Sequence, residues 1–398
     1  MKAELLAPAG NPAKLASALY FGADAVYIGG KAFSLRSFAD NFSESELSEA
    51  VSAAHAAKKK VYVAVNIFAR NADFSALSDY FRLLEKSGAD AAIVSDPGVV
   101  YAARKAAPAL SLHLSTQANT TNKYAVKFWA EEGISRVILA RELSVKEISE
   151  IRDFVPEMQL EAFVHGAMCI SYSGRCLLSD YLDGRPSNRG ACVQACRREY
   201  ALLARPSDGS ERFLPVQEDG RGTYILNSKD LNLFAHLSDL ERAGVDSFKI
   251  EGRMKSEYYL ATVINAYRRA MDGEDVSSLA SELDDVAHRE YTAAYAFGDN
   301  AQTVGYENSQ TKGKCTYIAN VLGSEEGFVL AEMRNRFRKG DVLEVLSPGE
   351  NFRKSFRAER ILDKEGAETE DARLVQGIYR VSCPYFLSEG DILRRREG

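Results

Sequence analysis

The 398-residue sequence has few of the features that mark membrane, secreted or disordered chains. No stretch reaches the ~18 uncharged apolar residues that a bilayer-spanning helix needs. The first ten residues include Glu4 and Pro8, so we expect no signal peptide there and no membrane partner. Prolines number only 10 and apolar residues make up 46% of the chain, which excludes a disordered or low-complexity protein. We therefore expect a cytoplasmic globular protein with roughly two or three domains.

Several enzyme motifs are also absent. There is no His-Glu-x-x-His zinc-protease motif and no Gly-x-Ser-x-Gly nucleophile elbow. No glycine-rich dinucleotide-binding turn follows the first predicted strand. Lys and Arg total 50 against 56 Asp and Glu, so the formal net charge is −6. An acidic chain argues against a polyanion-binding surface over the whole protein, but it leaves room for a local basic patch.

The first two thirds of the sequence alternate regularly between short apolar runs and amphipathic helical stretches. The helical stretches begin with capping residues, such as Asn11 before Pro12, and Ser43 with Glu46 three residues later. This alternation predicts a (β/α)8 TIM-type barrel over residues 1–300, with an open doubly wound sheet as the alternative. The eight predicted strands are residues 4–7, 25–28, 61–65, 91–94, 112–115, 136–139, 160–164 and 247–250.

Residues 301–398 have a different pattern. Their apolar residues form short alternating segments separated by Gly, Pro or Asn, which predicts a small all-β, barrel-like domain. Two basic clusters, within residues 334–339 and at residues 394–396, are interpreted as solvated turns, with a polyanion contact as the alternative. Cys315 and Cys383 are expected to be small buried side chains.

Basic residues gather at the end of the last predicted strand. In a barrel of this type the chemistry takes place at the carboxyl ends of the strands. Lys249, Glu251 and Arg253 alternate there, so they point to one face. They predict a site for a small dicarboxylate or a phosphate, with a salt-bridged barrel mouth as the alternative. The candidate anion-binding residues are Lys249, Arg253 and Lys255, completed by Arg141 or Arg189.

Other strand ends supply further polar candidates. Asn66 and Gln117 end predicted strands and are expected to donate hydrogen bonds into the pocket. Glu161, His165 and Glu251 are the candidate acid–base residues, although His165 could also be structural. Cys169 lies four residues after His165, so a cysteine–histidine pair of a peptidase is a further alternative.

One long insertion interrupts the alternation at about residues 166–225. Its four cysteines are spaced Cys-x6-Cys-x15-Cys-x3-Cys, a set that suits a [4Fe–4S] cluster or a tetrahedral zinc ion. The wide spacing favours the cluster, with zinc, free thiols or a disulfide as alternatives. We also expect residues 200–204 to form a hairpin with residues 223–226. The four cysteines are Cys169, Cys176, Cys192 and Cys196.

The residues around these cysteines resemble a known family. Residues 161–169 read Glu-Ala-Phe-Val-His-Gly-Ala-Met-Cys, and residues 174–179 read Gly-Arg-Cys-Leu-Leu-Ser. Residues 188–197 read Asn-Arg-Gly-Ala-Cys-Val-Gln-Ala-Cys-Arg, and residues 249–256 read Lys-Ile-Glu-Gly-Arg-Met-Lys-Ser. Together they resemble the signature of the U32 family, catalogued as collagenase-like peptidases. The resemblance covers residues 1–300 and continues into the C-terminal domain.

This resemblance implies an RNA-modifying activity. One group of the family makes 5-hydroxyuridine at the wobble uridine 34 of tRNA and requires prephenate, and another hydroxylates a cytidine of 23S rRNA. Relatives in ubiquinone synthesis carry a [4Fe–4S] cluster on four cysteines. The resemblance therefore implies tRNA or rRNA as partner and prephenate as co-substrate, with a collagenase-like peptidase acting on proteins as the alternative. It also implies a [4Fe–4S] cluster, for which zinc could substitute, on Cys169, Cys176, Cys192 and Cys196.

One stretch departs from the family pattern. Residues 288–295 read His-Arg-Glu-Tyr-Thr-Ala-Ala-Tyr, where family members tend to have two glycines. The substrate within the family therefore stays open.

Overall fold

The computed structural model describes residues 2–35, 40–198, 203–204, 214–215, 228–298 and 313–397. The chain divides into two compact units. The first comprises Met1–Pro12, Asp24–Met254 and His288–Thr311. The second comprises Ala13–Ala23, Lys255–Ala287 and Lys312–Gly398. The predicted domain boundary at residue 300 lies outside the described residues.

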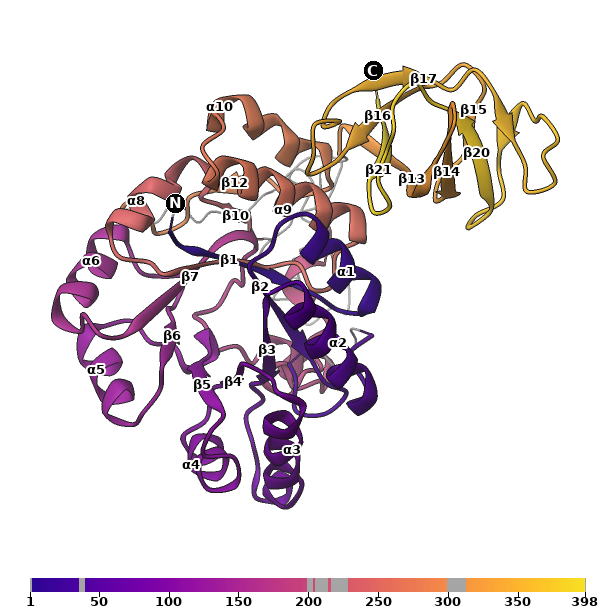
Figure 1. The fold of residues 1–398 in the computed structure, drawn as a ribbon. Helices are drawn as coiled ribbons and strands as arrows, with labels where there is room; N and C mark the ends of the chain where they lie inside the picture. The colour runs from indigo at the N-terminus through magenta and orange to yellow at the C-terminus, as the bar shows by residue number, and fades with distance from the viewer. Residues whose placement is uncertain are drawn as a thin grey trace. The chain divides into compact units, whose positions relative to one another are not determined.

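The first unit is built on a closed barrel of eight parallel strands (Figure 1). Neighbouring strands pair in chain order, and the last strand, β11, pairs with both β1 and β7, which closes the ring. This closure confirms the predicted (β/α)8 TIM-type barrel and excludes an open sheet. The barrel strands are β1 (Glu4–Pro8), β2 (Ala25–Gly29), β3 (Lys60–Val65), β4 (Ala91–Val94), β5 (Ser111–Leu114), β6 (Arg136–Ile138), β7 (Gln159–Ala167) and β11 (Ser247–Ile250).

Helices follow the strands and begin where the sequence places capping residues. The Ser43 hydroxyl accepts a hydrogen bond from the Glu46 N–H, and the Glu46 carboxylate accepts one from the Ser43 N–H, which is the predicted capping box. Helices α2 to α6 lie outside the strands in Figure 1. No described helix is both long and apolar enough to cross a bilayer. The helices are α1 (Pro12–Tyr20), α2 (Glu44–Ala56), α3 (Phe74–Ser87), α4 (Pro97–Ala106), α5 (Lys123–Glu131), α6 (Val145–Phe154), α8 (Leu237–Arg242) and α9 (Glu257–Met271).

The insertion between β7 and β11 contains short elements. They are α7 (Leu178–Asp183), η3 (Ser187–Arg189), η4 (Ala195–Arg197) and β10 (Asp230–Asn232). Strand β10 runs antiparallel to the end of β7. In the described part of this region, β8 (Leu203–Ala204) pairs with β9 (Leu214–Pro215). Residues 223–226, its predicted partner, lie outside the described residues.

The C-terminal part of the second unit contains an antiparallel sheet of seven strands in the order β17-β16-β21-β13-β14-β20-β18. Its apolar core includes the fully buried Phe337, Leu343 and Leu393. The predicted all-β domain is therefore confirmed. The strands are β13 (Cys315–Glu325), β14 (Phe328–Met333), β16 (Val342–Leu346), β17 (Ser355–Arg357), β18 (Ile361–Leu362), β20 (Ile378–Ser382) and β21 (Ile392–Arg396), with β15 (Phe337–Arg338) and β19 (Asp371–Ala372) in a separate pair.

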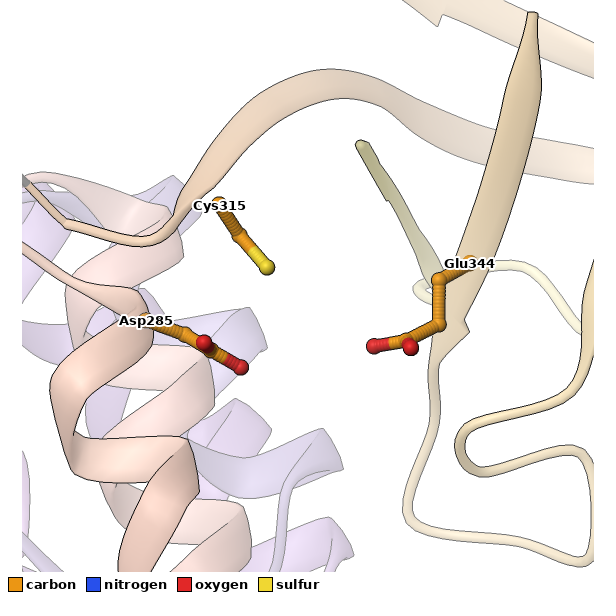
Figure 2. Close-up of side chains that lie close together, drawn as sticks. All are labelled: Asp285, Cys315 and Glu344. Carbon is orange, nitrogen blue, oxygen red and sulfur yellow. The ribbon is translucent and has the colours of Figure 1, made fainter. Parts of the chain in front are cut away.

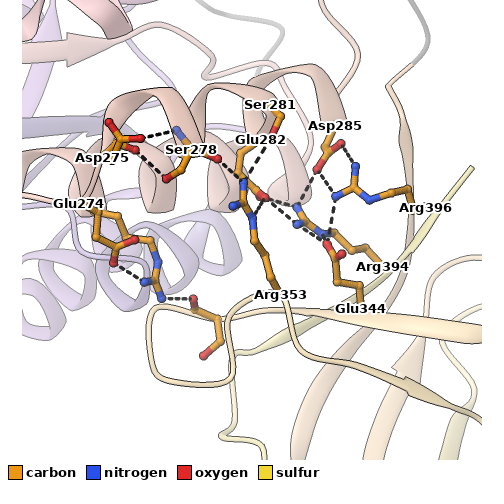
Figure 3. Close-up of polar contacts among 12 residues, drawn as sticks. Glu274, Asp275, Ser278, Ser281, Glu282, Asp285, Glu344, Arg353, Arg394 and Arg396 are labelled. Carbon is orange, nitrogen blue, oxygen red and sulfur yellow. Dashed lines mark hydrogen bonds and ion pairs between the residues drawn. The ribbon is translucent and has the colours of Figure 1, made fainter.

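Arg394 contradicts the interpretation of residues 394–396 as a solvated or polyanion-binding run. Its side chain is 0% exposed. The guanidinium donates to Glu282, in η6 (Ala280–Asp285), at 2.7 and 3.0 Å, and to Glu344 at 2.7 Å (Figure 3). Arg396 donates two bonds to Asp285, at 2.8 and 3.0 Å. These cations neutralise buried carboxylates, a role that a run of arginines in the sequence cannot reveal.

The same cluster includes a group that resembles a metal site. Asp285, Cys315 and Glu344 present ligand atoms within 4.8 Å of one another (Figure 2). Both carboxylates, however, are already bound by Arg394 or Arg396. Burial raises the pKa of Cys315 to about 12, so its thiol is neutral. The group is therefore part of an ion-pair cluster, and Cys315 is a buried thiol as expected.

Replacing Arg394 by methionine leaves buried carboxylates without their partner. We expect Arg394→Met to lower the free energy of unfolding by about 3–5 kcal/mol. Arg395→Met is the matched control on the same strand, because Arg395 is 32% exposed and pairs with Asp341. It should cost about 1 kcal/mol or less. Urea unfolding followed by circular dichroism measures both, and equal losses would contradict the assignment.

Candidate functional site

A cavity opens at the carboxyl ends of the barrel strands, and we call it the mouth cavity. Residues of strands β2 to β7 and β11, or of the loops that follow them, line it. Its volume is about 560 Å³, including open solvent at the entrance. Six residues singled out from the sequence meet there: Asn66, Gln117, Arg141, Lys249, Glu251 and Arg253.

Lys249 reaches this cavity from β11 and is held by a buried ion pair. Its ammonium group lies 2.7 Å from Glu161 Oε1 and 4.4 Å from the centre of the Tyr27 ring. Glu161 is fully buried, and its second oxygen accepts from Arg136 at 3.2 Å. Glu161, a predicted acid–base residue, therefore acts as a counterion that positions Lys249.

Arg253 lies in a space that only a glycine at the end of β2 leaves open. The side chain is buried, and Nη2 donates to Ser34 Oγ at 2.8 Å. A Cβ atom on Gly29 would lie 2.4 Å from Nη1 of Arg253. The space beside Gly29 is therefore filled by the guanidinium of Arg253. Sequence reasoning missed Ser34, which lies in the loop after β2 and carries no recognisable motif.

Arg141 and Glu251 complete the charged lining. Arg141 Nη1 donates to the Ala167 carbonyl at 2.6 Å, and its guanidinium lies 4.4 Å from the centre of the Phe163 ring. The Tyr27 hydroxyl, which sequence reasoning also missed, donates to Glu251 at 3.1 Å. The lining thus carries three cations and one carboxylate. Lys249 is already paired with Glu161, so the net positive charge of the lining is smaller than this count of cations.

All four cysteines of the insertion line a second cavity, which we call the cysteine cavity. The two cavities share a wall, because Leu35, Thr116, Gln117 and Arg141 line both. A molecule bound in the mouth cavity would therefore contact residues that also face the cysteines.

Three of the four insertion cysteines have shifted pKa values, and the sulfurs do not form a compact group. The Cys169 thiol donates a hydrogen bond to Cys176, which lowers the pKa of Cys176 to about 5 and raises the pKa of Cys169. Burial raises the pKa of Cys196. All six cysteines of the chain are free thiols. Among the described residues, no three of the four insertion sulfurs lie within 4.8 Å of one another.

Three predicted site residues lie elsewhere. Arg189 donates to Asp73 at 2.9 and 3.2 Å, which lowers the Asp73 pKa, so Arg141 rather than Arg189 accompanies Lys249 in the mouth cavity. Lys255 belongs to the second unit, where its ammonium group donates to a backbone carbonyl at 3.3 Å. His165 is fully buried in β7, with its ring centre 5.5 Å from that of Tyr291. No described histidine lines either cavity.

Comparison with protein families agrees with this architecture. The model of peptidase family U32 matches residues 10–305, and the model of the peptidase family U32 C-terminal domain matches residues 314–394. The chain belongs to peptidase family U32. The two matched regions correspond to the barrel with its cysteine insertion and to the C-terminal sheet.

Three U32-related sequences illustrate the functions named for similar proteins. The chain is 42% identical over 388 residues to "tRNA hydroxylation protein P1" of Bacillus subtilis, covering 94% of this chain and 90% of that one. It is 38% identical over 411 residues to "tRNA hydroxylation protein P" of Escherichia coli, covering 92% and 90%. It is 36% identical over 269 residues to the "23S rRNA 5-hydroxycytidine C2501 synthase" of Escherichia coli, covering 68% and 39%.

In this U32 protein a glycine allows the segment that contains Cys169 and Cys176 to lie close to the barrel. Gly174 has φ +75, and a Cβ atom there would lie 2.1 Å from the Gln117 carbonyl oxygen. Next to it, the Ser173 N–H donates to Glu142 at 2.8 Å. These contacts place the cysteine segment against Gln117, which is part of the wall that both cavities share.

Gly174→Ala should therefore disturb the junction of the two cavities. Gly184 is a matched control, because its φ is +63 but nothing lies within 4 Å of its added Cβ atom. Both substitutions share the cost of positive φ, about 1 kcal/mol, and only Gly174→Ala adds a backbone collision. We expect Gly174→Ala to lower the thermal midpoint by about 4 °C or more beyond Gly184→Ala. Calorimetry measures this difference, and equal midpoints would refute the close packing.

Proposed function

We propose that this U32 protein hydroxylates a pyrimidine in RNA. Uridine 34 of tRNA, converted to 5-hydroxyuridine, is the first candidate, and a cytidine of rRNA is the second. The proposal rests on the wall that the mouth cavity and the cysteine cavity share. It also rests on the similarity of the chain, over nine tenths of its length, to proteins named for tRNA hydroxylation. The tRNA assignment rests on those names and on the resemblance of the cysteine motifs.

The four cysteines offer the thiolates that an iron–sulfur cluster or a zinc ion needs, and their wide spacing in the sequence together with the family resemblance favours the cluster. Zinc–sulfur bonds of about 2.3 Å place tetrahedral sulfurs about 3.8 Å apart. Cys169 and Cys176 are hydrogen-bonded, but among the described residues no three of the four insertion sulfurs lie within 4.8 Å of one another, so they do not form a closed tetrahedral zinc site as they stand. Cys176 is already acidic, and thiolates are the ligands that iron and zinc need. A [4Fe–4S] cluster held by Cys169, Cys176, Cys192 and Cys196 would supply electron-transfer chemistry beside the shared wall.

The mouth cavity suits a small dicarboxylate such as prephenate. Arg253 and Arg141 offer planar guanidinium groups, which bind carboxylates in a bidentate fashion. Lys249 adds a cation whose position the buried Glu161 holds. Glu251 is the candidate acid–base residue of this cavity, since it is only partly buried and accepts from the Tyr27 hydroxyl.

A peptidase remains the alternative function, given the name of the family. A cysteine peptidase needs a thiolate beside a histidine. His165, the nearest candidate in the sequence, is fully buried, and no described histidine lines the cysteine cavity. The described residues therefore do not supply the thiolate–histidine pair of a cysteine peptidase at this cavity.

Deleting the gene tests the proposed reaction directly. We expect nucleoside mass spectrometry of the deletion strain to show loss of 5-hydroxyuridine or its derivatives from tRNA, or of hydroxycytidine from rRNA. Expression of the wild-type chain should restore the lost nucleoside. Unchanged hydroxylated nucleosides in a strain without a paralogue would contradict the proposal, and accumulation of undigested peptides would favour the peptidase.

Metal analysis of the anaerobically purified protein tests the cluster. We expect about four irons per chain and absorbance near ~400 nm from sulfur-to-iron charge transfer. Cys176→Ser should lose most of the iron, whereas Cys383→Ser, a buried thiol of the C-terminal sheet, should keep it. Stoichiometric zinc without iron would reject the cluster.

Calorimetric titration with prephenate tests the anion site. Each charged hydrogen bond contributes about 1.5–3 kcal/mol, so Arg253→Ala should weaken binding by about tenfold or more. Arg242→Ala is the control, because Arg242 is 73% exposed and does not line the mouth cavity. Equal affinity in wild type and Arg253→Ala, or no heat with either, would contradict the anion site and favour the alternative of a salt-bridged barrel mouth.

A further inference from the structure

The rim of the cysteine cavity carries exposed aromatic and basic side chains that neither the cluster nor the anion site uses. Tyr172 lines this cavity and is nevertheless 60% exposed. Arg197 lines it as well, from η4. Tyr181, in α7, is 86% exposed, and Leu177 is 72% exposed. Large side chains of this kind, held in water next to a cavity, are typical of a binding surface.

The segment that carries the four cysteines, residues 169–198, is positively charged, whereas the whole protein is negatively charged. Residues 169–198 contain five arginines, no lysine, two aspartates and no glutamate, which gives a net charge of +3 in a chain of −6, although Arg189 among them is neutralised by Asp73 from outside the segment. Arg175 is exposed, and so is Arg198, which is paired with Asp183 at 2.9 Å. A local positive surface on an acidic protein favours a polyanionic partner over a second copy of the same chain.

We propose that this rim binds a single-stranded segment of RNA. Tyr172 stacks on an unpaired base at the entrance of the cysteine cavity, and Arg197, with the exposed Arg175, contacts the phosphates beside it. Tyrosine rings and arginines at one edge are the groups that recognise unstacked bases in RNA loops. This inference rests on the proposed RNA hydroxylation and adds the surface that presents the nucleotide.

The test is binding of a fluorescent RNA hairpin of about 17 nucleotides with a pyrimidine-containing loop, measured by anisotropy on the anaerobically purified full chain. Tyr172→Ala should weaken binding about tenfold, because one stacking contact is lost, and Tyr172→Phe should retain it. Tyr124→Ala is the matched control, since Tyr124 is 68% exposed on α5. Iron content, measured in parallel, should be the same in all four proteins.

The salt dependence of the same binding tests the arginines. Arg197→Gln should lower the slope of log affinity against log salt by about one, since one phosphate contact is lost. Arg82→Gln, which removes a 59% exposed arginine on α3, should leave the slope unchanged.

The outcomes distinguish a failure of the RNA-binding rim from a failure of the proposed hydroxylation. If the wild type does not bind the hairpin, or Tyr172→Ala binds it as well as wild type does, the surface is wrong, whatever the deletion strain shows. If Tyr172→Ala and Leu177→Ala alter the sedimentation of the protein instead of its RNA affinity, the rim is a protein interface and the RNA proposal is overturned. If binding follows the prediction but the deletion strain keeps its hydroxylated nucleosides, the surface stands and the proposed hydroxylation fails.

Discussion

Inside the barrel the carboxylate of Glu161 lies between the ammonium group of Lys249, at 2.7 Å, and the guanidinium of Arg136, at 3.2 Å. The three side chains are 5% exposed or less. Removing each ion from water costs several kcal/mol, so each depends on its partners. Arg136, Glu161 and Lys249 come from the neighbouring strands β6, β7 and β11, and Arg136 also donates to Glu4 of β1 at 2.6 Å, so these ion pairs link several strands of the closed barrel. The pairing of β7 with β11 places the Lys249 ammonium group at the mouth cavity.

The mouth cavity and the cysteine cavity meet at Gln117 and Arg141. Gly174 lets the insertion approach the backbone of Gln117, and Gly29 leaves room for Arg253 in the mouth cavity. Two small residues thus allow the packing of a lining that carries cations and of a thiol-lined cavity beside it. In our account a carboxylate ligand and a redox group work on one nucleotide that enters at this junction.

The barrel and the cysteine cavity were predictable because their signals are periodic or local. Eight apolar runs alternate with capped helices, and the four cysteines lie within 28 residues on one insertion. The roles of charged residues were less accessible, because a charge in a sequence does not reveal its partner. The sequence predicts that Arg394 belongs to a solvated basic cluster, but its side chain is buried against Glu282. It also predicts that Arg189 completes the anion site, but Arg189 pairs with Asp73.

The central claim is that both cavities serve one reaction. Its most direct test is nucleoside mass spectrometry of RNA from a deletion strain that expresses equal amounts of Arg253→Ala, Cys176→Ser or Arg242→Ala protein. The account predicts that the first two variants fail to restore the hydroxylated pyrimidine and that Arg242→Ala restores it fully. Full restoration by Arg253→Ala, with none by Cys176→Ser, would contradict a shared site.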